Sequence, residues 1–400
     1  MRPIMKTKLD VPSGMVHPVL LTAVILVIAT TLRAPILGVG PLIQTLQSEF
    51  NLTTTMAGFL TTLPLVALGL IAPFAGNLAR VFGFEKTIFF ALLIMVSGII
   101  LRSMGQEWQL YSGTLLIGVS IAVGNVLLPG MVKRDFSDKV ASITGKYGVA
   151  IGVSAAVTSA TAIPLMNRFG WQVALACTLI FPVLGLALLY SRLNKSGKQA
   201  GAVATPMKKG KSVWSSWLAW QVTIFMSLNS IIFYAIVTWL PSVLTDAGNS
   251  KETAGSIHGF MQCASIVPGL ILGSIVAIRK DQKFITAVLC LFQCVALLGF
   301  ALIPDLSYAW AFMFGMGSGG ALILSLMFIG LRSTNPQQAA SLSGMAQCVN
   351  FLIGAFGPAV AGRIHTLTGN WSEVLYIGVL LSVIMIIFGV CAGRNLKIQS

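Results

Sequence analysis

The sequence predicts an all-α membrane protein whose twelve transmembrane helices form two pseudo-symmetric six-helix bundles. Three observations carry this prediction: an apolar composition, twelve long apolar segments, and a repeat that relates the two halves of the chain. Of the 400 residues, 56% are hydrophobic and only 9% are charged, and the mean hydropathy is +0.87. In soluble domains roughly a quarter of the residues are charged. Most of the surface is therefore expected to face lipid.

The apolar segments are long enough for helices and lack the pattern of a barrel. Each runs for about 20 residues or more, which lets a helix cross a hydrocarbon core of roughly 30 Å. Period-two alternation, which a membrane barrel needs, is not found. The expected spans are residues 18–46, 54–79, 86–104, 108–131, 140–166, 171–191, 217–245, 252–278, 284–304, 308–331, 338–362 and 371–393.

The spans divide into two sets of six. We expect an N-terminal bundle over residues 1–191, a cytoplasmic linker over 192–216 and a C-terminal bundle over 217–400. The linker is rich in lysine, glycine, serine and alanine, a composition typical of a solvated connection.

A repeat supports the two-half organisation. The run Ala-Ser-Ile-Thr-Gly at Ala141 to Gly145 recurs 199 residues later as Ala-Ser-Leu-Ser-Gly at Ala340 to Gly344. Pro41 late in the first span matches Pro241 late in the seventh, 200 residues on. Such repeats in a twelve-span carrier imply a pseudo-twofold axis along the membrane normal and a solute site between the halves at mid-depth.

The basic residues predict the orientation of the chain. With the N-terminus inside, twenty of the 26 Lys and Arg residues fall in cytoplasmic segments. The four that fall outside are Arg102, Arg168, Lys251 and Arg363. This asymmetry follows the positive-inside rule, so we expect a multi-pass protein of the cell inner membrane with both termini cytoplasmic. The net charge of +15 is thereby explained without nucleic acid, which we do not expect as a partner.

Two cations lie inside spans without a carboxylate. Arg33 falls near the middle of the first span and Lys146 one or two turns into the fifth, whereas all eleven acidic residues fall in loops or at span ends. A charge within a membrane is costly and usually marks a substrate path. An unpaired guanidinium attracts an anion, and its fork suits planar oxyanions. Alternatively, Arg33 snorkels toward a membrane interface or caps backbone carbonyls within the bundle, and the Lys146 side chain reaches the cytoplasmic face.

Polar residues at similar depth in both halves are candidates to complete a substrate-binding site. They are Asn125, Tyr147, Asn229, Tyr234, Gln262, Gln347 and Asn350. Each could instead join helix to helix. His258 is the only histidine expected inside a span, and the ordinary pKa of histidine lies near neutrality, so it is the one candidate for proton coupling. Alternatively, it is a hydrogen-bonded histidine near the outer mouth.

No enzyme or cofactor motif is found. Gly210-Lys211-Ser212 resembles the end of a phosphate-binding loop, but Thr205 stands where that loop needs a glycine. The six cysteines have no spacing typical of metal sites or disulfides. We therefore expect no catalytic residue, no metal and no cofactor. The expected partners are a small-molecule substrate and membrane lipid, and the expected state is a monomer.

Several stretches resemble the major facilitator superfamily and, within it, the cyanate-porter family that includes 2-nitroimidazole exporters. The superfamily signal is the run from Gly76 to Gly83, with Arg80 where the common motif has aspartate and Val81 where it has arginine. The narrower resemblance rests on Thr31-Leu32-Arg33, the run from Gly124 to Gly130 with Lys133-Arg134-Asp135-Phe136 behind it, Trp239-Leu240-Pro241, and Leu342-Ser343-Gly344-Met345-Ala346-Gln347. The resemblance implies the major facilitator fold and places Arg33, Asn125 and Gln347 at motif positions.

Together these features predict a secondary active transporter of a small anionic solute, cyanate-like or a small carboxylate, that works by alternating access. An exporter of neutral or weakly basic drugs such as nitroimidazoles is the alternative, with Arg33 in a structural role. A membrane-embedded sensor or scaffold is a third hypothesis, which a solute-flux assay would test.

Overall fold

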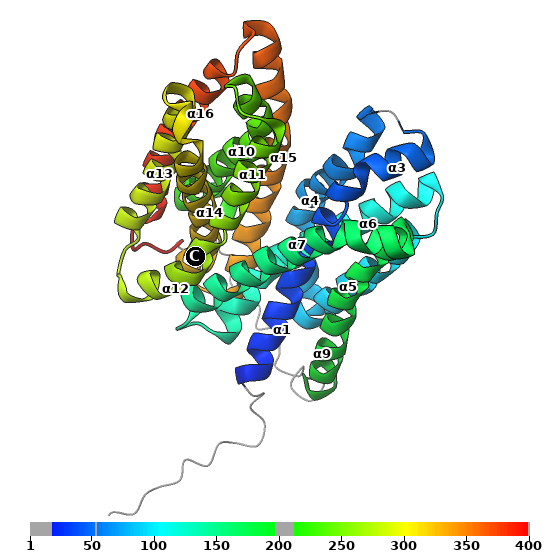
Figure 1. Cartoon of the computed structure of the whole chain (residues 1–400). Coiled ribbons are helices and arrows are strands. Elements are labelled where there is room, and N and C mark those ends of the chain that lie inside the picture. Colours follow the sequence, from blue (N-terminus) through cyan, green and yellow to red (C-terminus); the bar gives the residue numbers. More distant parts are fainter. Residues whose placement is uncertain (1–17, 53, 197–211, 399–400) are drawn as a thin grey trace, which may run out of the picture.

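The computed structural model describes residues 18–52, 54–196 and 212–398. Twelve of its segments are long and apolar enough to cross a membrane, as predicted. Figure 1 shows them as two bundles that meet at one end and diverge toward the other.

The first bundle contains the spans of the N-terminal half. Its elements are α1 (Pro18–Thr31), α2 (Ala34–Leu37), η1 (Gly40–Leu42), α3 (Ile43–Phe50), α4 (Thr54–Phe82), α5 (Phe84–Arg102), α6 (Glu107–Asp135), α7 (Val140–Phe169), α8 (Trp171–Ala176), η2 (Cys177–Leu179) and α9 (Ile180–Ser196). The second bundle consists of η3 (Val213–Ser215), α10 (Trp217–Asp246), α11 (Lys251–Ala264), α12 (Val267–Ile278), α13 (Lys283–Leu302), η4 (Pro304–Leu306), α14 (Ser307–Arg332), α15 (Pro336–Thr368) and α16 (Ser372–Ala392).

The predicted linker is described only at its two ends. Helix α9 continues to Ser196, and η3 begins at Val213. Residues 197–211 lie outside the described residues, as do the N-terminal Arg2, Lys6 and Lys8. We use the term linker side for the end of the molecule at which α1 begins and α9 ends (Figure 1). The domain limits themselves stay a prediction.

Three of the expected spans are not single α-helices: the sixth contains the 3-10 turn η2, whereas the first and the eighth are broken near their middles. Proline lacks the N–H that would bond the carbonyl four residues earlier, and a helix often ends there. For Pro35 that carbonyl belongs to Thr31, the last residue of α1, and for Pro268 it belongs to Ala264, the last residue of α11. The first break leaves Arg33 in non-helical backbone, with φ −128° and ψ −34°.

The two halves cross on the linker side at the repeated Ala-Ser-x-x-Gly motif. A Cβ atom added to Gly145 of α7 would lie 2.8 Å from the Gly269 carbonyl oxygen, and one added to Gly344 of α15 would lie 2.9 Å from the Ala72 carbonyl oxygen. Only glycine permits such backbone approach. The repeat therefore forms two equivalent crossings, α7 against α12 and α15 against α4.

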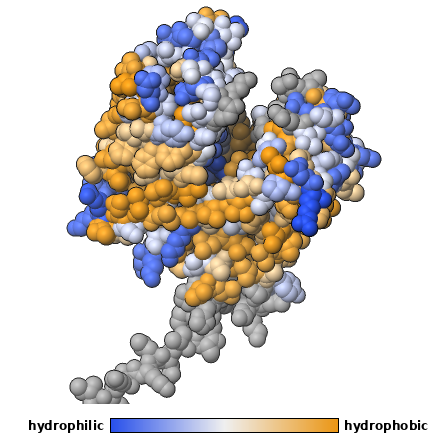
Figure 2. All heavy atoms as spheres, viewed as in Figure 1, coloured by the Kyte–Doolittle hydropathy of each residue, from blue (hydrophilic) through white to orange (hydrophobic). Residues whose placement is uncertain are grey.

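Away from the linker side the bundles separate. Figure 2 shows an apolar outer surface on both lobes and a hollow between them at the end opposite the beginning of α1. The side chains that face outward from the spans, such as Leu70, Phe90 and Ile387, are large and apolar, which suits contact with lipid tails. The fold therefore closes the linker side and leaves a space between the halves on the other.

Candidate substrate-binding site

A cavity of about 630 Å³ lies between the two halves. The break after α1, η1 and the middle of α7 form its first wall, and α10, α11 and α14 form its second wall. Its volume falls within the roughly 300–1,000 Å³ typical of sites for small molecules. The pseudo-twofold repeat predicted a site in this position.

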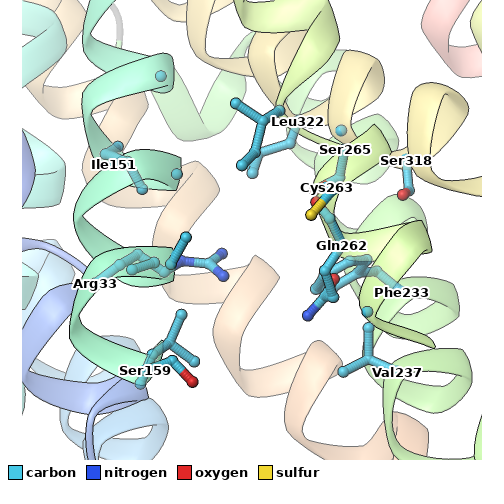
Figure 3. A pocket seen from close by; sticks show the side chains of 18 of the residues that line it. Arg33, Ile151, Ser159, Phe233, Val237, Gln262, Cys263, Ser265, Ser318 and Leu322 are labelled. Carbon is cyan, nitrogen blue, oxygen red and sulfur yellow. Dashed lines mark hydrogen bonds between the residues drawn. The ribbon is translucent and has the colours of Figure 1, made fainter. Parts of the chain in front are cut away.

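Arg33 enters the cavity from the first wall. Figure 3 shows its guanidinium pointing into the space between the walls. The Arg33 backbone carbonyl accepts hydrogen bonds from Ile36 and Leu37, 3.1 and 3.0 Å away, which fixes the residue at the start of α2. Within the described part of the chain, the guanidinium itself has no hydrogen bond and no ion pair, so all its donors are available to a ligand.

The second wall presents uncharged side chains to Arg33. Figure 3 shows Gln262 pointing toward the space that Arg33 enters, with Phe233 and Val237 beside it and Leu322 farther along the wall. Phe233 packs edge-on against Tyr234, with ring centroids 5.6 Å apart. An amide and an aromatic surface thus lie opposite a cation.

Two buried polar atoms of the second wall lack hydrogen-bond partners among the described residues. Asn229 donates from Nδ2 to the Ser318 carbonyl at 3.2 Å, which leaves its Oδ1 without a partner. His258 is hydrogen-bonded to the Val237 backbone, and its Nε2 has no partner. Buried polar atoms are normally satisfied, so these two are available to a bound solute or to water.

The charge of the cavity is positive. Of the residues that line it, Arg33 is the only one with a permanent charge, and none is acidic. Charges lined by protein atoms interact at a lower effective dielectric constant than in bulk water, so the attraction of the guanidinium for an anion is stronger than it would be in free solution. The site can therefore hold a single anionic or strongly polar group against Arg33 and an apolar body against Phe233.

The structure brings together half of the predicted site residues. Arg33, Asn229, Tyr234, His258 and Gln262 line the cavity. The other five lie outside it in this structure: Asn125, Lys146, Tyr147, Gln347 and Asn350. Their assignment to the site stays a prediction.

Helix packing explains where the remaining residues lie. Asn350 accepts a hydrogen bond from Ser230, so it joins α15 to α10 behind the cavity wall. Asn125 offers its backbone carbonyl to Ser343 at 3.3 Å, where α6 meets α15. Tyr147 is buried among the helices, and Gln347 is buried as well.

Lys146 is exposed and lies on the same face of α7 as Val153 and Val157, whose side chains are also exposed. A helical residue shares its face with those about seven positions on. The cavity face of α7 is formed instead by Gly148, Ile151 and Ala155. Lys146 therefore points away from the cavity.

Sequence reasoning missed Phe233 and Arg102. Phe233 lies 200 residues after Arg33, so the repeat offset was a signal that could have identified it. Arg102 was expected on the outer side, near the end of the third span, and it is the last residue of α5 and only 1% exposed.

A family model described as Major Facilitator Superfamily matches residues 19–358. The chain belongs to the major facilitator superfamily. This result confirms the predicted fold and the predicted transporter class. The solved structure of the proton:xylose symporter of this superfamily has a TM-score of 0.74 to this chain, at 12% identity, over 96% of this chain and 98% of that one.

Two relatives within the superfamily share most of their length with this chain. The 2-nitroimidazole transporter of Escherichia coli (strain K12) is 45% identical over 382 residues, which cover 95% of this chain and 97% of the relative. The cyanate transport protein CynX of the same organism is 25% identical over 355 residues, which cover 87% of this chain and 90% of the relative.

Proposed function

We propose that this major facilitator carries a small monovalent anion, cyanate-like or a small carboxylate, by alternating access across the inner membrane. The observation that supports the proposal is the Arg33 guanidinium, which enters a cavity without acidic lining residues and has no partner among the described residues. A carboxylate would receive two parallel N–H donors from it, the strongest geometry for such a pair.

A nitroimidazole is the second candidate. The relative with 45% identity is named for 2-nitroimidazole. A nitro group has two oxygens in one plane, as a carboxylate does, and can accept from the same guanidinium fork. The two candidates differ in whether the charge of Arg33 is needed, because a neutral nitro compound gains less from a cation than an anion does.

The test compares purified wild type with Arg33→Gln by thermal-shift binding, using benzoate, cyanate, 2-nitroimidazole and imidazole as probes. A ligand that binds only the folded state raises the melting temperature. Arg168→Gln is the matched control, since it removes an exposed cation at the end of α7 that does not line the cavity.

We expect benzoate or cyanate to stabilise wild type and Arg168→Gln, with affinity at least about tenfold weaker in Arg33→Gln, because hydrogen bonds to charged groups contribute about 1.5–3 kcal/mol. If neither anion stabilises wild type while 2-nitroimidazole stabilises both variants equally, the anion proposal is wrong and the nitroimidazole candidate replaces it.

We also propose that the linker side is cytoplasmic, as the distribution of basic residues predicts, so that the cavity faces the outside. Cys263 lines the cavity and is exposed, which makes it a reporter. A membrane-impermeant charged thiol reagent added to intact cells is expected to label Cys263, and Cys263→Ser is expected to lose that label. Labelling only in inverted vesicles would reverse the orientation.

Alternating access requires the glycine crossings of the linker side to separate and re-form. Gly145→Trp and Gly344→Trp place a large side chain where a Cβ atom alone would approach a backbone carbonyl to within 3 Å. Both variants are expected to lose transport and to show reduced outside labelling of Cys263, because the closed linker side can no longer form. Normal transport in both variants would contradict the mechanism.

The proposed proton-coupling role of His258 rests on its place in the cavity wall and its unpartnered Nε2. His258→Gln keeps a polar side chain but cannot take up a proton near neutral pH. We expect the variant to bind the anion but to lose acceleration of uptake by an inward proton gradient. An unchanged response to the gradient would exclude His258 as the coupling group.

A further inference from the structure

A second buried arginine contacts the short element that carries Arg33. Arg102 ends α5, is 1% exposed, and donates from Nη1 to the Pro35 carbonyl at 2.7 Å. Its Nε and Nη2 have no hydrogen-bond partner, and no ion pair joins it to an acid, among the described residues. Among the described residues, the one hydrogen bond of this guanidinium is thus with the residue two positions after Arg33.

The Pro35 carbonyl is left free by the local backbone. Helix α2 is only four residues long. The Gly38 N–H bonds the Ala34 carbonyl, and the Val39 N–H bonds the Ile36 carbonyl, so neither of these donors reaches Pro35. A buried carbonyl needs a donor. Arg102 supplies it from a neighbouring span.

The backbone of α5 at Arg102 packs closely against α6. A Cβ atom added to Gly113 of α6 would lie 2.5 Å from the backbone nitrogen of Arg102 and 2.5 Å from the Gly98 carbonyl oxygen. The backbones of α5 and α6 are therefore in direct contact at this point. Arg102 therefore projects from a rigid pair of helices onto the broken span.

We infer that Arg102 is a positioning residue, which holds α2, and through it Arg33, at a fixed place in the cavity wall. The inference rests on the proposed role of Arg33 in substrate binding. Removing a charge from water is costly, and a single backbone bond offsets only part of that cost, so a buried arginine is a poor choice for packing alone. A short helix between a break and a turn has little stability of its own, and a donor from α5 fixes it.

The test uses Arg102→Met and Arg102→Lys, with affinity for benzoate and melting temperature as readouts. Arg102→Met cannot donate to Pro35, and we expect benzoate affinity to fall about five- to tenfold. Arg102→Lys keeps a charged N–H donor group and is expected to restore most of that affinity. If Arg102→Met is not recovered folded, Arg102→Gln takes its place, because its shorter side chain does not reach the Pro35 carbonyl.

Arg332→Met is the matched control. Arg332 ends α14, is 2% exposed, and donates from Nε to the Ala392 carbonyl at 2.8 Å, so it is also a buried arginine bonded to backbone, but it lies on the linker side. It does not line the cavity. We expect Arg332→Met to lower the melting temperature while benzoate affinity stays within about twofold of wild type.

A double-mutant cycle separates positioning from general destabilisation. If Arg102 acts through Arg33, Arg102→Met will not weaken benzoate binding further in an Arg33→Gln background, because coupled residues are not additive. Equal loss of affinity from Arg102→Met in both backgrounds, or no loss in either, would overturn the inference. No effect of Arg33→Gln alone would instead count against the proposed function.

Discussion

The first span of each half occupies an equivalent place in the fold, and the two differ where they meet the cavity. In the N-terminal half the span is broken into α1, α2, η1 and α3, and Arg33 lies in the break. In the C-terminal half α10 runs without interruption from Trp217 to Asp246 and places Phe233, 200 residues after Arg33, on the opposite wall. The shared scaffold thus carries a charge on one wall and a ring on the other.

This difference gives the cavity one charged wall and one aromatic wall. A solute with a polar group at one end and a flat apolar body at the other fits with the polar group at Arg33 and the body at Phe233. The pseudo-symmetric backbone supplies the crossings that let two halves move, whereas one side chain in each half supplies recognition. Changing these two residues therefore tests recognition without touching the crossings.

The largest effect is expected from Arg33→Phe, which makes the two walls alike. Loss of two charge-assisted hydrogen bonds should weaken benzoate binding on the order of 30-fold or more. Equilibrium binding of radiolabelled benzoate to purified protein measures the loss, with Arg168→Phe as the control for a surface change of the same kind. Binding of benzoate at wild-type strength to Arg33→Phe would show that the anion is held elsewhere.

A smaller and more selective effect is expected from Phe233→Ala. An aromatic contact contributes about 0.5–1.5 kcal/mol beyond the area that it buries, so benzoate affinity should fall roughly three- to tenfold. Cyanate has no ring, and its affinity should change by less than about twofold. The ratio of the two affinities is the measurement. An equal loss for both anions would mean that Phe233 shapes the cavity as a whole rather than contacting the ring.

The sequence predicted the parts of the fold that depend on hydrophobicity along the chain. The twelve spans and the two-half organisation follow from runs of apolar residues and from the repeat at Ala141 and Ala340, whose glycines form the two crossings. Arg33 could be selected because a charge at mid-span without a carboxylate is costly in lipid and usually faces a cavity.

The direction in which each side chain points around its helix axis could not be predicted in the same way. Successive residues of a helix point about 100° apart, so one position decides whether a residue lines a cavity or packs behind it. Gly148 lines the cavity, whereas Tyr147, one position earlier, is buried behind it and Lys146 points outward. Helix packing sets that rotation, and a single sequence contains no direct record of it.

The break in the first span is the subtlest part of the comparison, and Pro35→Ala tests its cause. An alanine at position 35 regains an N–H that can bond the Thr31 carbonyl, which would join α1 to α2 and turn Arg33 away from its present direction. We expect benzoate affinity to fall about two- to fivefold, since the guanidinium stays near the cavity but is less well placed. Hydrogen exchange over residues 31–37 should slow as the helix becomes continuous.

Pro241→Ala is the matched control, because it removes a proline from the equivalent span, where the helix is already unbroken. It should change neither benzoate affinity nor exchange near Arg33. If Pro35→Ala also leaves both unchanged, the missing N–H is not what keeps the span broken. Alanine keeps the carbonyl at position 35, so the hydrogen bond from Arg102 would then be what holds the span in its broken form. In that case the double variant Arg102→Met, Pro35→Ala should show the slowed exchange that Pro35→Ala alone did not.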